Sequence, residues 1–169
     1  MNTATLQGSV QRHDVLNGTL PLVYFSDSRD VTPLSWATAN RQLLEDGLLK
    51  YGAVLLRGFK KYDVAELEDF IEKTSGNLLA YKNRSTPRSL VAGKIYTSTE
   101  YPADQIIHQH NESCYTHEWP TRLFFCCITA AARGGETPIA DSRKVLKRIP
   151  QEIVERFDRN GVTYLRTFT

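Results

Sequence analysis

The sequence has 169 residues, with 21 Lys and Arg against 19 Asp and Glu and a formal net charge of +2. Its 41% hydrophobic and 24% charged residues are typical of a globular domain and exclude a wholly disordered or collagen-like chain. The balanced charge gives no electrostatic basis for binding nucleic acid, and no apolar run approaches the roughly 18 residues of a membrane span. A chain of this length predicts one domain.

The first half of the chain carries alternating strand and helix signals. An apolar segment at 20–25 predicts a short strand. A Thr-Pro pair at 32–33 predicts the start of a helix that stops at Gly52. The apolar run 53–57 predicts a buried strand, and a second helix is predicted over 63–76, with an aspartate as its cap and a glycine at its end.

The second half is predicted to contain a long loop, several strands and two short helices. Residues 77–102 are rich in Ser, Thr, Arg, Gly and Pro and predict an ordered loop with a short strand near 90–96. Helices are predicted over 142–146, capped by Ser142, and over 150–161. Apolar and β-branched runs predict strands at 105–115, 122–130, 137–140 and 162–168.

The spacing of the cysteines favours packing in a core over a dedicated site. Cys114, Cys126 and Cys127 are an odd number and form no CxxC pair. Free cysteines in an apolar run behave as small buried hydrophobes, so we expect Cys126 and Cys127 to pack in a core. Unpaired cysteines also favour a reducing compartment, and the predicted location is the cytoplasm.

One segment carries residues that can bind a metal. In a strand over 105–115, His108, His110, Glu112 and Cys114 would lie on one face. A histidine and a carboxylate two residues apart can occupy neighbouring positions on one ion, as in the 2-His-1-carboxylate triad of non-haem Fe(II) oxygenases. Such a triplet also arises by chance in ordinary strands. A zinc site that includes Cys114 is the alternative that these ligand types leave open.

Further segments match a known family in the family's own order. The sequence contains Gly52–Gly58 (GAVLLRG), Tyr96–Asp104 (YTSTEYPAD), the His110–Glu112 triplet, Glu118–Pro120 (EWP) and Gly134–Arg143 (GGETPIADSR). With these, the chain from about residue 32 onward resembles the TauD/TfdA (taurine dioxygenase-like) family of Fe(II)/2-oxoglutarate dioxygenases. The resemblance is closest to the SyrP-like branch.

The resemblance implies a fold and a metal site. The expected fold is α+β, a double-stranded β-helix (jelly roll) with flanking N-terminal helices. His110 and Glu112 match the family's first histidine and its carboxylate ligand, with no catalytic residue beyond the metal ligands. Thr137 matches the threonine that contacts the distal carboxylate of 2-oxoglutarate. The implied cofactors are Fe(II) and 2-oxoglutarate, and the retained carboxylate favours hydroxylation over halogenation.

The resemblance also implies a substrate class. SyrP-like relatives act in secondary metabolism on amino acids, either free or attached to a carrier protein, and O₂ is the oxidant. The implied partners are therefore an amino-acid-like substrate and a carrier protein, without nucleic acid or membrane. The residues expected to lie near the substrate are Ser98, Thr99, Glu100 and His108.

Two elements of the family's site have no counterpart in the sequence. In the family, the distal histidine and the 2-oxoglutarate-binding arginine lie well beyond the Gly-Gly-Glu-Thr segment, and no histidine follows His117 in this sequence. We therefore expect residues 1–169 to be the N-terminal portion of one oxygenase domain, with the C-terminal portion absent, and to be inactive alone. A second chain is then an expected partner. The alternatives are a non-catalytic or split-chain interaction protein of the same fold and a zinc or cupin-like metal-binding protein.

Overall fold

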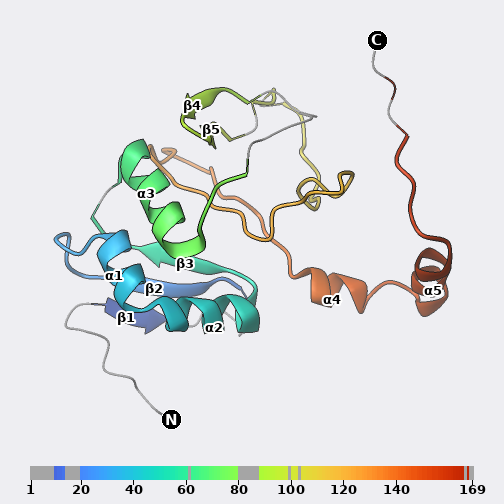
Figure 1. Ribbon diagram of the computed structural model, residues 1–169, viewed down its shortest axis with the longest axis horizontal. Coiled ribbons are helices and arrows are strands. Elements are labelled where there is room, and N and C mark those ends of the chain that lie inside the picture. The colour runs from blue at the N-terminus through green and yellow to red at the C-terminus, as the bar shows by residue number, and fades with distance from the viewer. Residues whose placement is uncertain are drawn as a thin grey trace. The chain divides into compact units, whose positions relative to one another are not determined.

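The computed structural model describes residues 10–13, 20–60, 62–79, 88–98, 100–102, 104–165 and 167 (Figure 1). The chain divides into two compact units. The first comprises Met1–Ile107 and Leu123–Glu136, and the second comprises His108–Arg122 and Thr137–Thr169. No helix in the described ranges is long and apolar enough to span a membrane.

A three-stranded sheet with the order β1-β2-β3 lies in the first unit. Its strands are β1 (Val10–His13), β2 (Leu22–Ser26) and β3 (Val54–Arg57). β2 pairs antiparallel with β1 and parallel with β3. Alternate residues of β2 are buried, as expected for a strand with one face in a core. The structure confirms the predicted strands at 20–25 and 53–57, whereas β1 was not predicted.

Two helices connect β2 to β3, where the sequence predicts one. They are α1 (Pro33–Ala39) and α2 (Arg41–Tyr51). The predicted ends are confirmed, because Thr32 accepts a hydrogen bond from the Ser35 amide and Gly52 adopts the left-handed conformation. The break lies at Asn40, whose side-chain amide donates to the Trp36 carbonyl at 2.9 Å. A polar side chain that competes for backbone groups in this way interrupts the helix.

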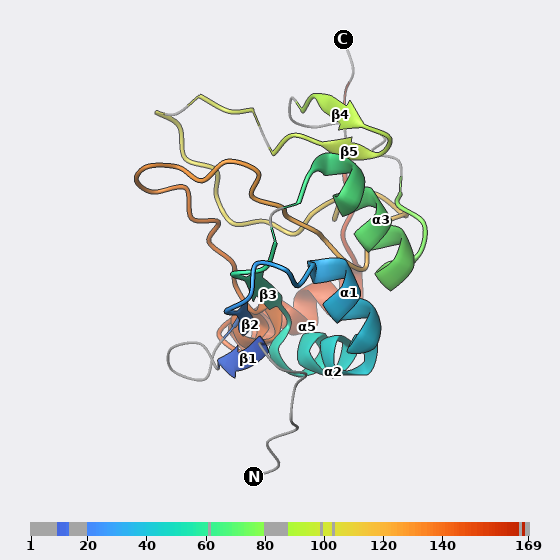
Figure 2. The ribbon, with the colours of Figure 1, turned by 90° about the vertical axis from the view of Figure 1, so that its left-hand side faces the viewer.

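The core of the first unit lies between the sheet and these helices (Figure 2). The rings of Tyr24 and Trp36 lie 4.6 Å apart between centroids, and both residues are buried. Helix α2 approaches the sheet closely at Gly47, where an added Cβ would lie 3.0 Å from the Leu22 Cδ2 atom. A larger residue at this crossing point would therefore need the Leu22 side chain to move by a few tenths of an ångström. The members of this buried apolar cluster are Val10, Leu22, Tyr24, Trp36 and Ala37.

The predicted second helix is confirmed as α3 (Val64–Ser75). Asp63 accepts from the Glu66 amide at 2.8 Å, and the Glu66 carboxylate accepts from the Asp63 amide at 3.0 Å. This reciprocal pair is a capping box, which satisfies two amides that the helix itself leaves unpaired. The short strand predicted near 90–96 is a hairpin of β4 (Leu90–Ala92) and β5 (Ile95–Tyr96).

The second unit contains α4 (Ser142–Leu146) and α5 (Gln151–Asn160), as predicted. The cap of α4 is Asp141 and not Ser142, because Asp141 accepts from the Arg143 amide at 3.0 Å. A carboxylate is the stronger acceptor for a helix N-terminal amide. The pKa of Asp141 is lowered, chiefly by its hydrogen bond with Arg143.

The strand predictions in the second half are wrong for the described residues. None of these residues forms a strand within 105–115, 122–130, 137–140 or 162–168. Apolar alternation favours a strand only where a neighbouring strand completes the hydrogen-bond ladder, and the described residues supply no such neighbour here. The α+β class is confirmed, but the described strands do not close a jelly roll.

The expected burial of Cys126 and Cys127 is also largely wrong. Cys127 is exposed and Cys126 is half-buried, and Cys114, for which no burial was expected, is exposed. Because the 122–130 run forms no strand, it is not packed on both faces as the prediction required. Burial raises the pKa of the Cys126 thiol, as desolvation does for any acid.

Candidate functional site

The His-x-Glu triplet lies in an extended segment that ends in a turn. The turn covers residues 112–115, and Ser113 has a φ of 55°, in the left-handed region that non-glycine residues rarely adopt. The Thr116 amide donates to the Ser113 carbonyl at 3.1 Å. The chain therefore reverses directly after Glu112, and the predicted shared strand face of His108, His110, Glu112 and Cys114 does not form.

The His110 ring is held by the backbone. Its Nδ1 atom lies 2.8 Å from the His108 carbonyl oxygen. Because a carbonyl can only accept, Nδ1 carries the proton, and in the neutral ring Nε2 keeps its lone pair. A backbone carbonyl is one of the usual acceptors for the far ring nitrogen of a metal-binding histidine.

The free ring nitrogen faces the carboxylate of the motif. His110 Nε2 lies 4.0 Å from Glu112 Oε2, with side chains 57% and 16% exposed respectively. One nitrogen lone pair and one carboxylate oxygen therefore lie side by side, with the imidazole accessible from solvent. An imidazole nitrogen and a carboxylate oxygen are common ligands of first-row transition-metal ions.

The distance between these two atoms is compatible with one shared ion. Donor atoms about 2.1 Å from a common metal can lie at most about 4.2 Å apart, and about 3 Å apart at a right angle. The 4.0 Å separation falls inside that limit, and a right-angled pair requires the atoms to close by about 1 Å. His110 and Glu112 are thus within reach of one metal ion, and they would bind it as neighbouring ligands once the two atoms move about 1 Å closer.

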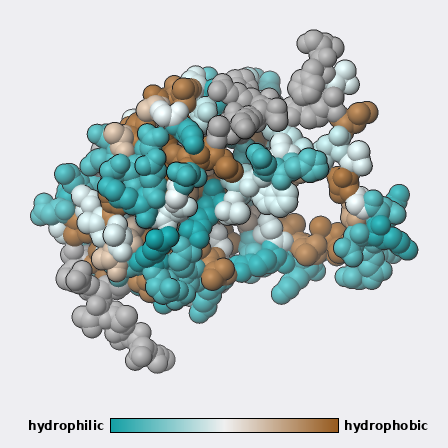
Figure 3. Space-filling view, viewed as in Figure 1, coloured by the Kyte–Doolittle hydropathy of each residue, from teal (hydrophilic) through white to brown (hydrophobic). Residues whose placement is uncertain are grey.

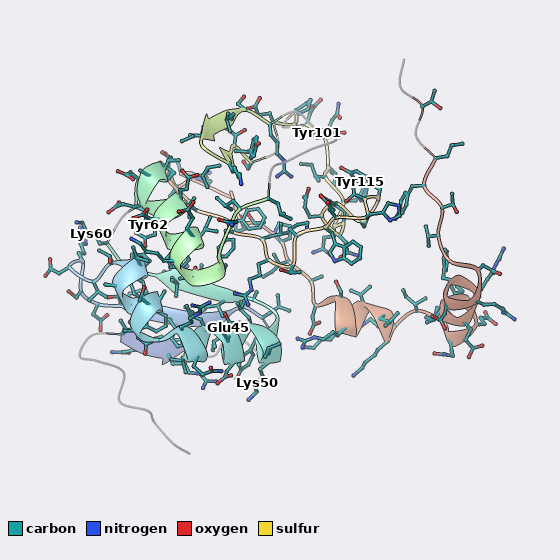
Figure 4. The ribbon with its side chains drawn as sticks, viewed as in Figure 1. Glu45, Lys50, Lys60, Tyr62, Tyr101 and Tyr115 are labelled. Carbon is teal, nitrogen blue, oxygen red and sulfur yellow. The ribbon has the colours of Figure 1, made fainter. Side chains whose placement is uncertain are left out.

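Cys114 does not join this pair. Its Sγ atom lies 3.5 Å from the Tyr164 hydroxyl, which donates to it. The Tyr164 ring also meets the ring of Tyr115, labelled in Figure 4, with 6.4 Å between centroids. In the described part of the chain, no three His, Cys, Asp or Glu residues are grouped to hold a metal. The zinc site with Cys114 as third ligand is therefore not assembled in this structure.

The Gly-Gly turn before Thr137 has the conformation that its sequence requires. Gly134 and Gly135 have φ values of 66° and 81°. A Cβ on Gly135 would lie 2.8 Å from the Ala131 Cβ, so the chain path needs glycine here. Thr137 follows this turn, is exposed, and belongs to the same unit as His110 and Glu112. Its contact with 2-oxoglutarate stays a prediction.

The structure describes three of the four residues that are expected to lie near the substrate. Ser98 and Glu100 are exposed and lie in the first unit, whereas Thr99 lies outside the described residues. The pKa of Glu100 is lowered because the hydroxyls of Ser89 and Thr97 donate hydrogen bonds to its carboxylate. The His108 side chain is exposed. Substrate contact by all four residues stays a prediction.

Two positioning contacts were not predicted from the sequence. The His108 backbone carbonyl orients the His110 ring, a role that no residue pattern encodes. The Ser142 hydroxyl lies 3.4 Å from the Asn111 Oδ1 atom and so joins the motif to the first residue of α4. Ser142 lies in the 134–143 segment that resembles the family, and this resemblance is the sequence feature that could have drawn attention to the contact.

Comparison with known proteins gives the family. The model of the taurine catabolism dioxygenase TauD, TfdA family matches residues 21–169. The chain belongs to the TauD/TfdA family.

Two curated relatives are similar over about three quarters of this TauD/TfdA chain. The dapdiamide synthesis protein DdaC of Enterobacter agglomerans is 39% identical over 125 residues, which cover 74% of the chain and 38% of DdaC. A clavaminate synthase-like protein of Arabidopsis thaliana is 36% identical over 129 residues, which cover 75% of the chain and 39% of the relative. The chain thus spans well under half of the length of either relative.

Proposed function

We propose that the chain is part of an Fe(II)- and 2-oxoglutarate-dependent oxygenase that hydroxylates an amino-acid-like substrate. The observation that carries the proposal is the His110–Glu112 pair, with Nε2 and Oε2 4.0 Å apart and the ring fixed through Nδ1. This pair occurs in a chain of the TauD/TfdA family, which typically uses these cofactors.

Each residue has a distinct role in the proposal. His110 and Glu112 hold the metal, and the Thr137 hydroxyl donates a hydrogen bond to the distal carboxylate of 2-oxoglutarate. Fe(II) with 2-oxoglutarate supplies the means to oxidise an unactivated C–H bond with O₂. The Glu112 carboxylate occupies a position that chloride would need, which favours hydroxylation over halogenation.

The proposed site needs groups beyond the described pair. The facial triad has two histidines and one carboxylate, and the pair provides one of each. The chain matches 38% and 39% of its two relatives, so most of their length has no counterpart in it. We propose that the remainder of the domain brings the second histidine, the arginine for 2-oxoglutarate and the strands of a closed jelly roll.

The substrate class rests on the family and on one relative. DdaC is named as a dapdiamide synthesis protein, and it is 39% identical to this chain where they match. That name supports a role for this chain in the synthesis of a secondary metabolite. We propose an amino acid, either free or carried on a protein, as the molecule that is hydroxylated.

The test of this proposal measures turnover with and without the remainder of the domain. We call the part of DdaC that lies C-terminal to the region matched by this chain the completing segment. We expect 2-oxoglutarate-dependent succinate formation from the chain joined to the completing segment, in the presence of Fe(II), O₂ and a panel of amino acids. We expect none from the chain alone. Turnover by the chain alone, or equal turnover with zinc in place of iron, would contradict the proposal.

A further inference from the structure

A pocket lies where the two parallel strands of the first unit end. The loop at 27–31 follows β2, and the loop at 58–60 follows β3. Because β2 and β3 run parallel with Phe25 opposite Arg57, both loops leave the sheet at the same edge. Ligands of open sheets with parallel strands bind outside the carboxyl ends of those strands. The sheet topology therefore favours this edge as a place for a ligand.

The pocket is large enough for a small molecule. It has a volume of about 400 Å³, and small-molecule sites occupy roughly 300–1,000 Å³. We call it the strand-end pocket, and its lining residues, all in the first unit, are Arg29, Gly58, Phe59 and Lys60. Figure 3 shows mainly hydrophilic surface over the loops after β2 and β3, and Figure 4 labels Lys60 at the edge of the first unit.

Backbone contacts hold the two loops that form the pocket. The Lys60 amide donates to the Val31 carbonyl at 3.0 Å and so joins one loop to the other. The Ser28 amide donates to the Ser26 hydroxyl oxygen at 3.2 Å, which orders the turn that carries Arg29. Gly58 has a φ of 77°, and a Cβ at this position would collide with the Ser26 carbonyl oxygen. The pocket is therefore formed before a ligand binds, which lowers the entropic cost of binding.

The apolar wall of the pocket is anchored in the core. Phe59 is half-buried and packs against the buried apolar cluster. Its ring centroid lies 5.7 Å from that of Trp36, with the two rings nearly edge to face. A ring held in this way offers a fixed apolar surface to a ligand, as the walls of small-molecule sites usually do.

The polar groups of the pocket are both cations. None of the described ion pairs involves Arg29 or Lys60. Two carboxylates, Asp27 and Asp30, are close in sequence but do not line the pocket, and Asp27 accepts a hydrogen bond from the Gln11 side chain at 3.2 Å. A guanidinium binds carboxylate and phosphate groups through paired hydrogen bonds, and an ammonium adds a compact positive charge. The pocket therefore selects an anion.

We propose that the strand-end pocket binds a small organic anion. Its carboxylate or phosphate group contacts Arg29 and Lys60, and its apolar part lies against the Phe59 ring. An inorganic anion would leave that ring uncovered, and a neutral aromatic molecule would leave both cations without a counter-charge. The inference goes beyond the proposed function and does not rest on it, because neither residue of the His110–Glu112 pair lines the pocket.

The first test titrates the unaltered full chain, without iron, with four probes and follows the backbone amides by NMR. Benzoate and phenyl phosphate carry both features, inorganic phosphate lacks the apolar part, and benzyl alcohol lacks the charge. We expect the tighter of the two organic anions to bind at least tenfold more tightly than benzyl alcohol and at least threefold more tightly than inorganic phosphate. Tighter binding of phenyl phosphate assigns a phosphate ester as the ligand, and tighter binding of benzoate assigns a carboxylate.

The second test compares two double variants that remove the same charge. Arg29→Gln/Lys60→Gln removes both cations of the pocket, whereas Arg41→Gln/Lys50→Gln removes two cations of α2 that do not line it. We expect at least tenfold weaker binding of the organic anion for the first variant and a change within twofold for the second. The comparison separates a defined site from general attraction to a positive surface.

The pattern of amide shifts in the unaltered chain does not depend on how the variants fold. The largest shifts should lie at 27–31 and 58–60. Failure of both organic anions to bind, equal weakening in the two double variants, or shifts largest outside these loops would overturn the proposal. So would benzyl alcohol binding as tightly as the anions.

Discussion

Trp36 carries a polar group that the core does not satisfy. The residue is 4% exposed, and its ring lies 4.6 Å from that of Tyr24 and 5.7 Å from that of Phe59 between centroids. Its Nε1 atom is buried and has no hydrogen-bond partner among the described residues. Replacing Trp36 with Phe therefore removes both packing atoms and an unpaired donor.

The lost packing and the removal of the unpaired donor change the free energy of unfolding by similar amounts in opposite directions. The smaller ring leaves roughly 40 Å³ of empty space, which costs about 1 kcal/mol at about 24 cal/mol per Å³. Loss of buried apolar carbon costs about a further 1.5 kcal/mol. Removing a buried unpaired N–H stabilises the fold by about 1–3 kcal/mol. We expect Trp36→Phe to change the free energy of unfolding by less than about 1.5 kcal/mol, against about 3–5 kcal/mol lost in Trp36→Ala.

The assay is urea denaturation of the full chain followed by far-ultraviolet circular dichroism, which does not depend on tryptophan. Trp119→Phe is the matched control, because Trp119 is 60% exposed and its replacement should change stability by less than about 0.5 kcal/mol. The reasoning is refuted if Trp36→Phe destabilises the chain as much as Trp36→Ala, because the indole N–H would then be satisfied.

Three further predictions concern the helix cap, a buried phenol and the cofactor site. Asp63→Ala should lower the free energy of unfolding by about 1 kcal/mol, because it removes the capping box of α3. Asp69→Ala, which removes an exposed ion pair with Lys73, should cost under about 0.5 kcal/mol in the same denaturation assay. Burial raises the pKa of Tyr62 to about 12, so stability should fall as pH rises from about 10 to about 12, where only the unfolded state ionises. Tyr62→Phe should flatten that fall in denaturation curves, and no pH dependence from Tyr62 is expected below about pH 10. Thr137→Val should weaken 2-oxoglutarate binding to the completed protein about 10- to 100-fold in calorimetry, with Fe(II) binding unchanged.

Much of the first unit could be predicted because its signals are local. Thr32 and Gly52 mark helix ends through their own hydrogen bond and backbone conformation, and the Asp63–Glu66 pair is visible as a cap three residues apart. The split at Asn40 could not be predicted, because it depends on a hydrogen bond between its side chain and the Trp36 carbonyl.

The strands of the second half could not be predicted correctly because strand formation depends on a partner. Residues 105–115 and 162–168 have the composition of strands, yet no described strand forms hydrogen bonds with them in a sheet. In the candidate site too, the residue types could be predicted from local spacing, but the features that depend on other groups could not. His110 and Glu112 could be selected from their spacing, but the tautomer of His110 depends on the His108 carbonyl. The reversal after Glu112 depends on the backbone of Ser113.

The most direct test of the central claim is an anaerobic titration with Fe(II) and 2-oxoglutarate, followed by visible absorption. The chain joined to the completing segment should develop the iron–2-oxoglutarate band. His110→Ala and Glu112→Ala should each abolish the band, whereas His117→Ala, at an exposed histidine outside the pair, should retain it. A band that persists in both ligand variants, or one that never forms in the joined protein, would contradict the assignment of His110 and Glu112 as metal ligands.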